Sequence, residues 1–148
     1  MAPSGRSQGW IAVGVDGSEP SQAALRWAAT EAHQRGLGLQ VVACWSYPML
    51  PWGPYQPPLS GQDFEAQARQ VAETEVEAVL GPDRDSLDVE IAVLEGAASL
   101  RLLDYDQAAE MIVVGSRGRG GFAGLLLGSV SQHLAERARC PVVIVRPH

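Results

Sequence analysis

Continuous apolar runs and one alternating segment divide the chain into short predicted strands. Residues 9–15, 39–45 and 111–114 are almost uninterrupted apolar runs, which is typical of parallel strands buried on both faces. Residues 89–93 instead alternate Val and Ile with Glu and Ala, the pattern of a half-exposed edge strand. A last apolar run at 142–145 completes a predicted set of five strands.

Between these runs, apolar side chains recur at helical spacing. A first helix is predicted from a cap at Ser18 to a stop at Gly36, and further helices at 63–80, 97–109 and 130–138. Because strands and helices alternate, the expected fold class is α/β. We expect a three-layer sandwich in which four helices cover both faces of a five-stranded parallel sheet through right-handed crossovers.

A proline-rich segment at 46–62 interrupts this alternation. Its five prolines remove backbone donors and fix φ, so it is predicted to be a loop without helix or strand. It leaves the carboxyl end of the second strand, and it could cover a ligand there as a lid. The alternative, which the sequence favours, is a variable surface loop.

Length and charge restrict the class of protein. The chain has 148 residues, a length that predicts a single domain, here at 9–148. Residues 1–8 are small and polar and are predicted to be a disordered N-terminus. A net charge of −6 and a pI near 4.9 argue against a general nucleic-acid binder. No apolar run approaches the ~20 residues that span a bilayer and no signal peptide is evident. A cytoplasmic location without membrane association is therefore expected.

The remaining ionisable side chains show no catalytic or metal-binding spacing. Cys44 and Cys140 are predicted to be buried reduced thiols. Glu73, Glu75 and Glu77 fall in a predicted helix and are interpreted as a solvated charged face. The histidines are expected at the surface: His33, His133 and His148.

The segment 111–131 predicts a strand, a glycine-rich loop and a helix start. Glycines allow backbone N–H groups to approach a ligand, and a helix N-terminus adds unpaired N–H groups and partial positive charge. The loop begins with Ser116, and its side chains add hydroxyls and fixed positive charge. A phosphate-binding site is therefore predicted. The side chains that supply these donors are Arg117, Arg119, Ser129 and Ser131.

Two better-known phosphate motifs do not apply. The P-loop needs a Lys after its glycines, and the chain contains none. The absence of Lys also argues against a receiver domain, which has the same broad architecture. Residues 118–123 satisfy G-x-G-x-x-A, but this match lies late in the chain, without the following strand and acidic residue of a dinucleotide site.

The spacing Gly115-x2-Gly118-x9-Gly128-Ser129 resembles the ATP-binding signature of the universal stress protein family. The resemblance extends over nearly the whole chain, from Val13 to Val145. It implies a Rossmann-like fold of the adenine nucleotide alpha hydrolase type, with strand order 3-2-1-4-5. It also implies ATP as the ligand, with Mg²⁺ carried by the phosphates, and a homodimer that pairs through an antiparallel contact of residues 142–145.

The same resemblance assigns roles to individual positions. Gly14 and Asp16 would line the ribose, and the Val42–Ala43 backbone would meet the adenine edge. The phosphates would be held by the loop and the helix start that follows it, with Arg117 and Arg119 on the family's variable loop. The implied phosphate ligands are Gly115, Gly118, Gly128, Ser129, Val130 and Ser131.

Three functions remain open. The favoured one is a dimeric, ATP-dependent regulatory module of the stress response with an unidentified protein partner. The second is a slow ATPase, for which the sequence offers no evident general base, so hydrolysis is expected to be weak at most. The third is a dimeric adaptor that binds another adenine nucleotide, such as cyclic AMP, or none.

Overall fold

The central sheet has the predicted composition and order. The computed structural model describes residues 8–55, 58–118 and 126–147. Five strands, all paired in parallel, lie in the order β5-β2-β1-β6-β7. Numbered along the chain within this sheet, they give the expected order 3-2-1-4-5. Their bounds are β1 Trp10–Gly14, β2 Gly38–Trp45, β5 Val89–Glu95, β6 Met111–Gly115 and β7 Val142–Val145.

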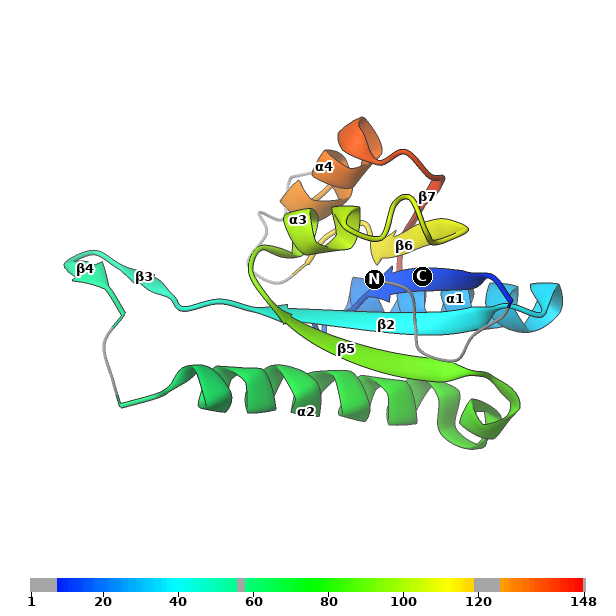
Figure 1. Ribbon diagram of the computed structural model, residues 1–148, viewed down its shortest axis with the longest axis horizontal. Helices are drawn as coiled ribbons and strands as arrows, with labels where there is room; N and C mark the ends of the chain where they lie inside the picture. The colour runs from blue at the N-terminus through cyan, green and yellow to red at the C-terminus, as the bar shows by residue number, and fades with distance from the viewer. Residues whose placement is uncertain (1–7, 56–57, 119–125, 148) are drawn as a thin grey trace.

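Four helices cover the two faces of the sheet, as predicted. Residues of α1 (Glu19–Arg35) and α2 (Gly61–Leu80) share one buried cluster with the sheet. Residues of α3 (Ala98–Leu103) and α4 (Ser129–Arg137) belong to a second cluster on the opposite face (Figure 1). A short 3-10 helix, Gly81–Ser86, follows α2. The three-layer α/β sandwich is confirmed.

The ends of α1 follow local chemistry that is readable in the sequence. The Ser18 hydroxyl accepts a hydrogen bond from the Ser21 N–H at 3.3 Å, which satisfies one of the donors left open at a helix start. Pro20 lies in the first turn, where its missing N–H costs nothing. At the other end Gly36 takes the left-handed conformation with φ 67°, which glycine adopts without steric cost.

The prediction of a loop without elements at 46–62 was wrong. Two short strands, β3 (Met49–Leu50) and β4 (Gly53–Pro54), pair antiparallel and form a hairpin beyond the end of β2 (Figure 1). Proline is tolerated at the edge of a sheet. α2 also begins earlier than expected, because a capping box between Ser60 and Asp63 starts the helix at Gly61.

Aromatic packing holds the base of this hairpin on α2. Phe64 of α2 stacks on Trp45 with ring centroids 6.3 Å apart, and it meets Tyr47 and Tyr55 edge-on at 5.6 and 5.3 Å. The sequence analysis considered the prolines and overlooked these contacts. Whether the hairpin acts as a lid stays a prediction.

The third predicted helix is shorter than expected. α3 ends at Leu103 instead of residue 109, and the chain continues in tight turns whose N–H groups bond three residues back, as in Tyr105 to Leu102 at 3.1 Å. Tyr105 is thereby buried against Trp10, edge-on at 5.6 Å. The predicted disordered N-terminus, apart from Gln8, lies outside the described residues, as do Arg119 and His148.

Candidate functional site

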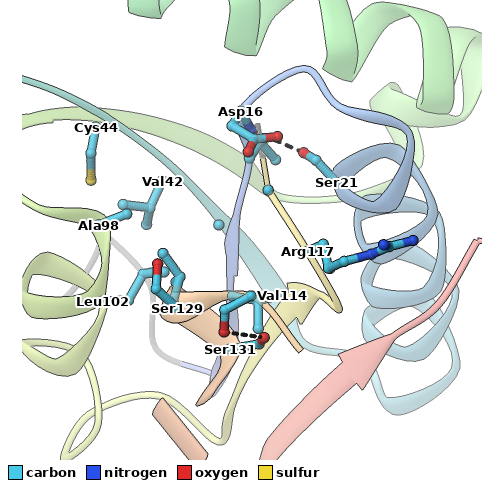
Figure 2. A pocket seen from close by; sticks show the side chains of 16 residues that line it. Asp16, Ser21, Val42, Cys44, Ala98, Leu102, Val114, Arg117, Ser129 and Ser131 are labelled. Atoms are coloured by element: carbon cyan, nitrogen blue, oxygen red, sulfur yellow. Dashed lines mark hydrogen bonds between the residues drawn. The ribbon is translucent and has the colours of Figure 1, made fainter. Parts of the chain in front are cut away.

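The pocket lies at the carboxyl ends of β1 and β6 (Figure 2). The chain leaves β1 toward β2 on one side and leaves β6 toward β7 on the other, so the winding of the sheet reverses between these two strands. Ligands of open α/β sheets bind at such a point. The cavity measures about 240 Å³, near the lower end of the ~300–1,000 Å³ typical of small-molecule sites.

One part of the pocket wall is apolar. It is formed by Val42 and Cys44 of β2 together with Ala98 and Leu102 of α3 (Figure 2). Burial raises the pKa of the Cys44 thiol to about 11, against a smaller lowering by Arg101. The thiol is therefore neutral at physiological pH, and this wall suits the face of a flat, weakly polar ring.

The opposite part of the wall is polar. Asp16 follows β1, and its Oδ1 accepts hydrogen bonds from the N–H (2.9 Å) and the hydroxyl of Ser18. Its Oδ2 faces the glycine loop, because a Cβ placed on Gly118 would lie 2.8 Å from that oxygen. The structure thus brings Asp16 close to Gly118 of the glycine loop, two positions to which the family resemblance assigns the ribose and the phosphates of one ligand.

The three glycines of the signature serve different purposes. A Cβ on Gly115 would lie 2.7 Å from the carbonyl carbon of Pro20 in α1, so this glycine lets β6 and α1 pack closely. A Cβ on Gly128 would lie 3.1 Å from the Cα of Arg117, so this one lets the ends of the loop meet. Among the described residues, a Cβ on Gly118 would meet only the end of the Asp16 side chain, on the pocket side.

Ser131 and Ser116 close the loop from within. The buried Ser131 hydroxyl donates to the Ser116 carbonyl at 2.9 Å, with the Gly128 carbonyl 3.1 Å away. The Ser116 N–H donates to the Val145 carbonyl at 2.8 Å. Both serines are thus engaged in holding the loop against β7 and α4.

Most of the predicted site residues line the pocket. Ala43 and Ser116 are buried and do not line it, and Arg119 lies outside the described residues. Their roles in binding, like those of the lining residues, stay predictions. The predicted residues that do line the cavity are Gly14, Asp16, Val42, Gly115, Arg117, Gly118, Gly128, Ser129, Val130 and Ser131.

The interpretation of Glu75 as solvated was wrong. Glu73 and Glu77 are exposed, but the side chain of Glu75 is only 3% exposed. Its carboxylate accepts hydrogen bonds from the Ser21 hydroxyl and the Gly17 N–H, beside the pocket. Helical periodicity contained the signal, because Glu75 falls three residues after Ala72 and four before Val79 on the apolar face of α2.

The cysteines and histidines among the described residues do not form a catalytic or metal-binding group at the site. Cys44 and Cys140 are both free and half-buried, and burial raises the pKa of Cys140 as well. His33 is exposed as expected, whereas His133 is half-buried with its Nε2 out of contact with solvent. Within residues 8–55, 58–118 and 126–147, no group of three or more His, Cys, Asp or Glu side chains could hold a metal ion. No helix in these ranges could cross a membrane.

Comparison with known proteins decides the family. The sequence model of the universal stress protein family matches residues 10–146. The chain belongs to the universal stress protein family. A member from Mycobacterium tuberculosis strain H37Rv is 38% identical over 144 residues, which is 95% of this chain and 48% of the relative. The chain thus spans about half the length of this relative.

Solved structures of the family share the fold. A universal stress protein from Archaeoglobus fulgidus is 26% identical with a TM-score of 0.66, over 93% of this chain and 98% of that one. A universal stress protein crystallised with cAMP is 26% identical with a TM-score of 0.59, over 97% of this chain and all of the other. An adenine nucleotide is therefore the ligand of a family member with this fold.

Proposed function

We propose that the chain binds an adenine nucleotide in the pocket between β1 and β6 and acts as a nucleotide-dependent regulatory module. The observation that carries the proposal is the approach of Asp16 to Gly118, where a carboxylate and a glycine of the signature face each other at the reversal point of the sheet. The family member crystallised with cAMP supports the choice of ligand class.

The two parts of the pocket wall suit the two ends of a nucleotide. The adenine ring would lie against the apolar wall of Val42, Cys44, Ala98 and Leu102. The phosphates would meet the N–H groups of the glycine loop and of the first turn of α4. No side chain among the described residues caps α4, so these N–H groups can donate to an anion, which the helix dipole also favours.

ATP with Mg²⁺ is the ligand that we propose within this class. Arg117 lines the pocket with its guanidinium turned away from Val42 and Ser129 (Figure 2). Turned inward, this guanidinium would meet phosphate oxygens and favour a more highly charged nucleotide. The Mg²⁺ would be carried by the phosphates, as is usual for this ion when few carboxylates are present. Titrations of ATP with Mg²⁺, of AMP and of cAMP will rank the three ligands.

The test is calorimetric titration of these nucleotides into protein freed of carried nucleotide. The wild type should bind, and Gly118→Trp should abolish binding because its side chain would fill the space beside Asp16. Leu100→Trp, at a position of α3 that is 50% exposed and outside the pocket wall, is the matched control and should bind normally. A folded wild type that binds none of the three nucleotides would refute the proposal.

We also propose a homodimer through β7. This strand lies at the edge of the sheet, and all four of its residues are half-buried in the monomer. An apolar edge strand is an aggregation hazard unless it is covered or paired. Light scattering should then give about twice the monomer mass of 15.8 kDa, and the melting temperature should rise with protein concentration. A monomer mass at all concentrations would contradict this arrangement.

A role in the stress response, in the cytoplasm, completes the proposal. The module would act by changing its contact with a protein partner when the nucleotide binds. Affinity capture from cells with nucleotide-loaded protein and with the Gly118→Trp variant should then recover different partners. Identical recovery would argue against a nucleotide-dependent role.

A further inference from the structure

Glu75 is the one charged side chain that is buried among the residues that the structure describes. It belongs to α2, which lies against the sheet on the face opposite to α3 and α4, and it does not line the pocket. A carboxylate is almost never buried unless its oxygens are paired, because transfer from water is costly. Its partners therefore indicate why it is present.

Glu75 is hydrogen-bonded to Gly17, in the turn that carries Asp16, and to Ser21, in the first turn of α1. Oε1 of Glu75 accepts from the Gly17 N–H at 2.8 Å, and the Ser21 hydroxyl lies 2.8 Å from Oε2 and 3.0 Å from Oε1. The same hydroxyl oxygen accepts from the Asp16 N–H at 3.0 Å, as the dashed line in Figure 2 shows. A hydrogen-bonded chain thus runs from the Asp16 backbone through Ser21 to Glu75.

Ser21 is both a donor and an acceptor in this chain. Its hydroxyl has one hydrogen, which it donates to the Glu75 carboxylate. The lone pairs of the same oxygen accept the Asp16 N–H. Glu75 in this way holds two successive N–H groups, those of Asp16 and Gly17, at a turn where Gly17 has a φ of 84°.

We propose that Glu75 is a positioning residue for the nucleotide site, acting through Ser21 and Gly17 to aim Asp16 at the glycine loop. Ser18 orients the Asp16 carboxylate, while Glu75 holds the backbone from which that carboxylate extends. The inference rests on the proposed function, because the group being aimed is the carboxylate that would meet the nucleotide.

A glutamine at this position weakens the chain. Its single amide oxygen could accept from Gly17 and from Ser21, as Oε1 does, but its NH2 cannot accept, so the shorter bond from Ser21 to Oε2, at 2.8 Å, would be lost. Glu75→Gln therefore keeps the size of the side chain but removes its charge and one of its two acceptor oxygens. Glu77→Gln, an exposed position on the same helix, makes the same change of charge and is the matched control.

The experiment makes two measurements on each variant. Calorimetry measures the affinity for AMP and for ATP, and nitrogen-15 NMR spectra without nucleotide record the chemical shifts of the Asp16 and Gly17 amides. Glu75→Gln should weaken binding of both nucleotides roughly tenfold and move both amide signals. Glu77→Gln should change neither. Leu80→Ala, a buried position of α2 outside the pocket wall, should lower thermal stability and leave the affinity unchanged.

The outcomes separate this inference from the proposed function. A wild type that binds neither nucleotide overturns both. If the wild type binds and Glu75→Gln binds equally well, the positioning role alone is overturned. The same holds if Leu80→Ala loses affinity along with its thermal stability, because a general loss of stability would then explain the effect of Glu75→Gln. If Glu75→Gln does not fold, Glu75→Asp replaces it, since this variant keeps the charge, withdraws the carboxylate from Gly17 and Ser21 and leaves the pocket wall unchanged, and the same tenfold loss is expected.

Discussion

Alanine at Gly115 and alanine at Gly118 should have opposite consequences, although both glycines belong to the same signature. A methyl group on Gly115 would lie 2.7 Å from the carbonyl carbon and from the Cβ of Pro20, and 2.8 Å from its carbonyl oxygen. Carbon atoms pack best at about 3.5–4.0 Å. The overlap of roughly 1 Å can be relieved only by moving the start of α1 away from β6, because two of the three neighbours are backbone atoms.

Overpacking of this kind costs about 1–3 kcal/mol. For a chain of 148 residues each kcal/mol lowers the melting temperature by about 2–4 °C, so Gly115→Ala should melt about 2–12 °C below the wild type. Within the part of the chain that the structure describes, a methyl group on Gly118 closely approaches only Oδ2 of Asp16, at 2.8 Å, and the end of a side chain can rotate away. Its effect on stability should stay within about 0.5 kcal/mol.

The affinity should follow the reverse order. Gly118→Ala displaces the Asp16 carboxylate from the glycine loop, and the loss of one hydrogen bond to a charged group should weaken nucleotide binding about tenfold. Differential scanning calorimetry without nucleotide measures the melting temperatures. Isothermal titration calorimetry, at a temperature at which both variants are folded, measures the affinities. Equal melting temperatures for the two variants, or a greater loss of stability at Gly118, would refute the packing argument.

Three further predictions follow from particular side chains. With a pKa of about 11, Cys44 is thiolate in roughly one molecule in a thousand at pH 8. Its alkylation by iodoacetamide should therefore accelerate about tenfold per pH unit up to pH 10. AMP should slow the alkylation of Cys44 and not that of Cys140, and equal protection of both thiols would count against a ligand at the apolar wall. Hydrogen bonds from the Ser60 backbone and hydroxyl lower the pKa of Asp63. This carboxylate therefore contributes stability above its unfolded pKa, and the contribution is lost as the pH falls through its lower folded pKa. The free energies of unfolding in urea of the wild type and Asp63→Asn should differ at pH 6 and converge at pH 2, and a constant difference would contradict the assignment. If the hairpin closes over the ligand, Trp52, which is 80% exposed, should lose exposure when a nucleotide binds. Quenching of its fluorescence by acrylamide, measured relative to Trp52→Phe, should then decrease. Unchanged quenching would mean that the hairpin stays at the surface and does not act as a lid.

Local patterns were sufficient for most of the fold. The apolar runs of β1, β2 and β6 and the helix stop at Gly36 each depend on a few neighbouring residues, whose period and turn chemistry are read directly along the chain. The strand order needed more than these patterns, and it was expected correctly because the signature from Gly115 to Ser129 resembles that of a family with this topology. The hairpin was missed because its stability depends on Phe64, which packs on residues that precede it by up to nineteen positions.

The sequence by itself determined the order along the chain of the four helices and of the five strands of the central sheet. It also determined the half-exposed character of β5 and the place of the glycine loop between β6 and α4. Only the tertiary structure decided what each of these residues does. Glu75 and Gly17 are 58 residues apart, and Gly115 is separated from Pro20 by most of the chain. Contacts of this kind arise when helices dock on a sheet, and no local period encodes which polar side chain is then enclosed or which glycine has backbone against it.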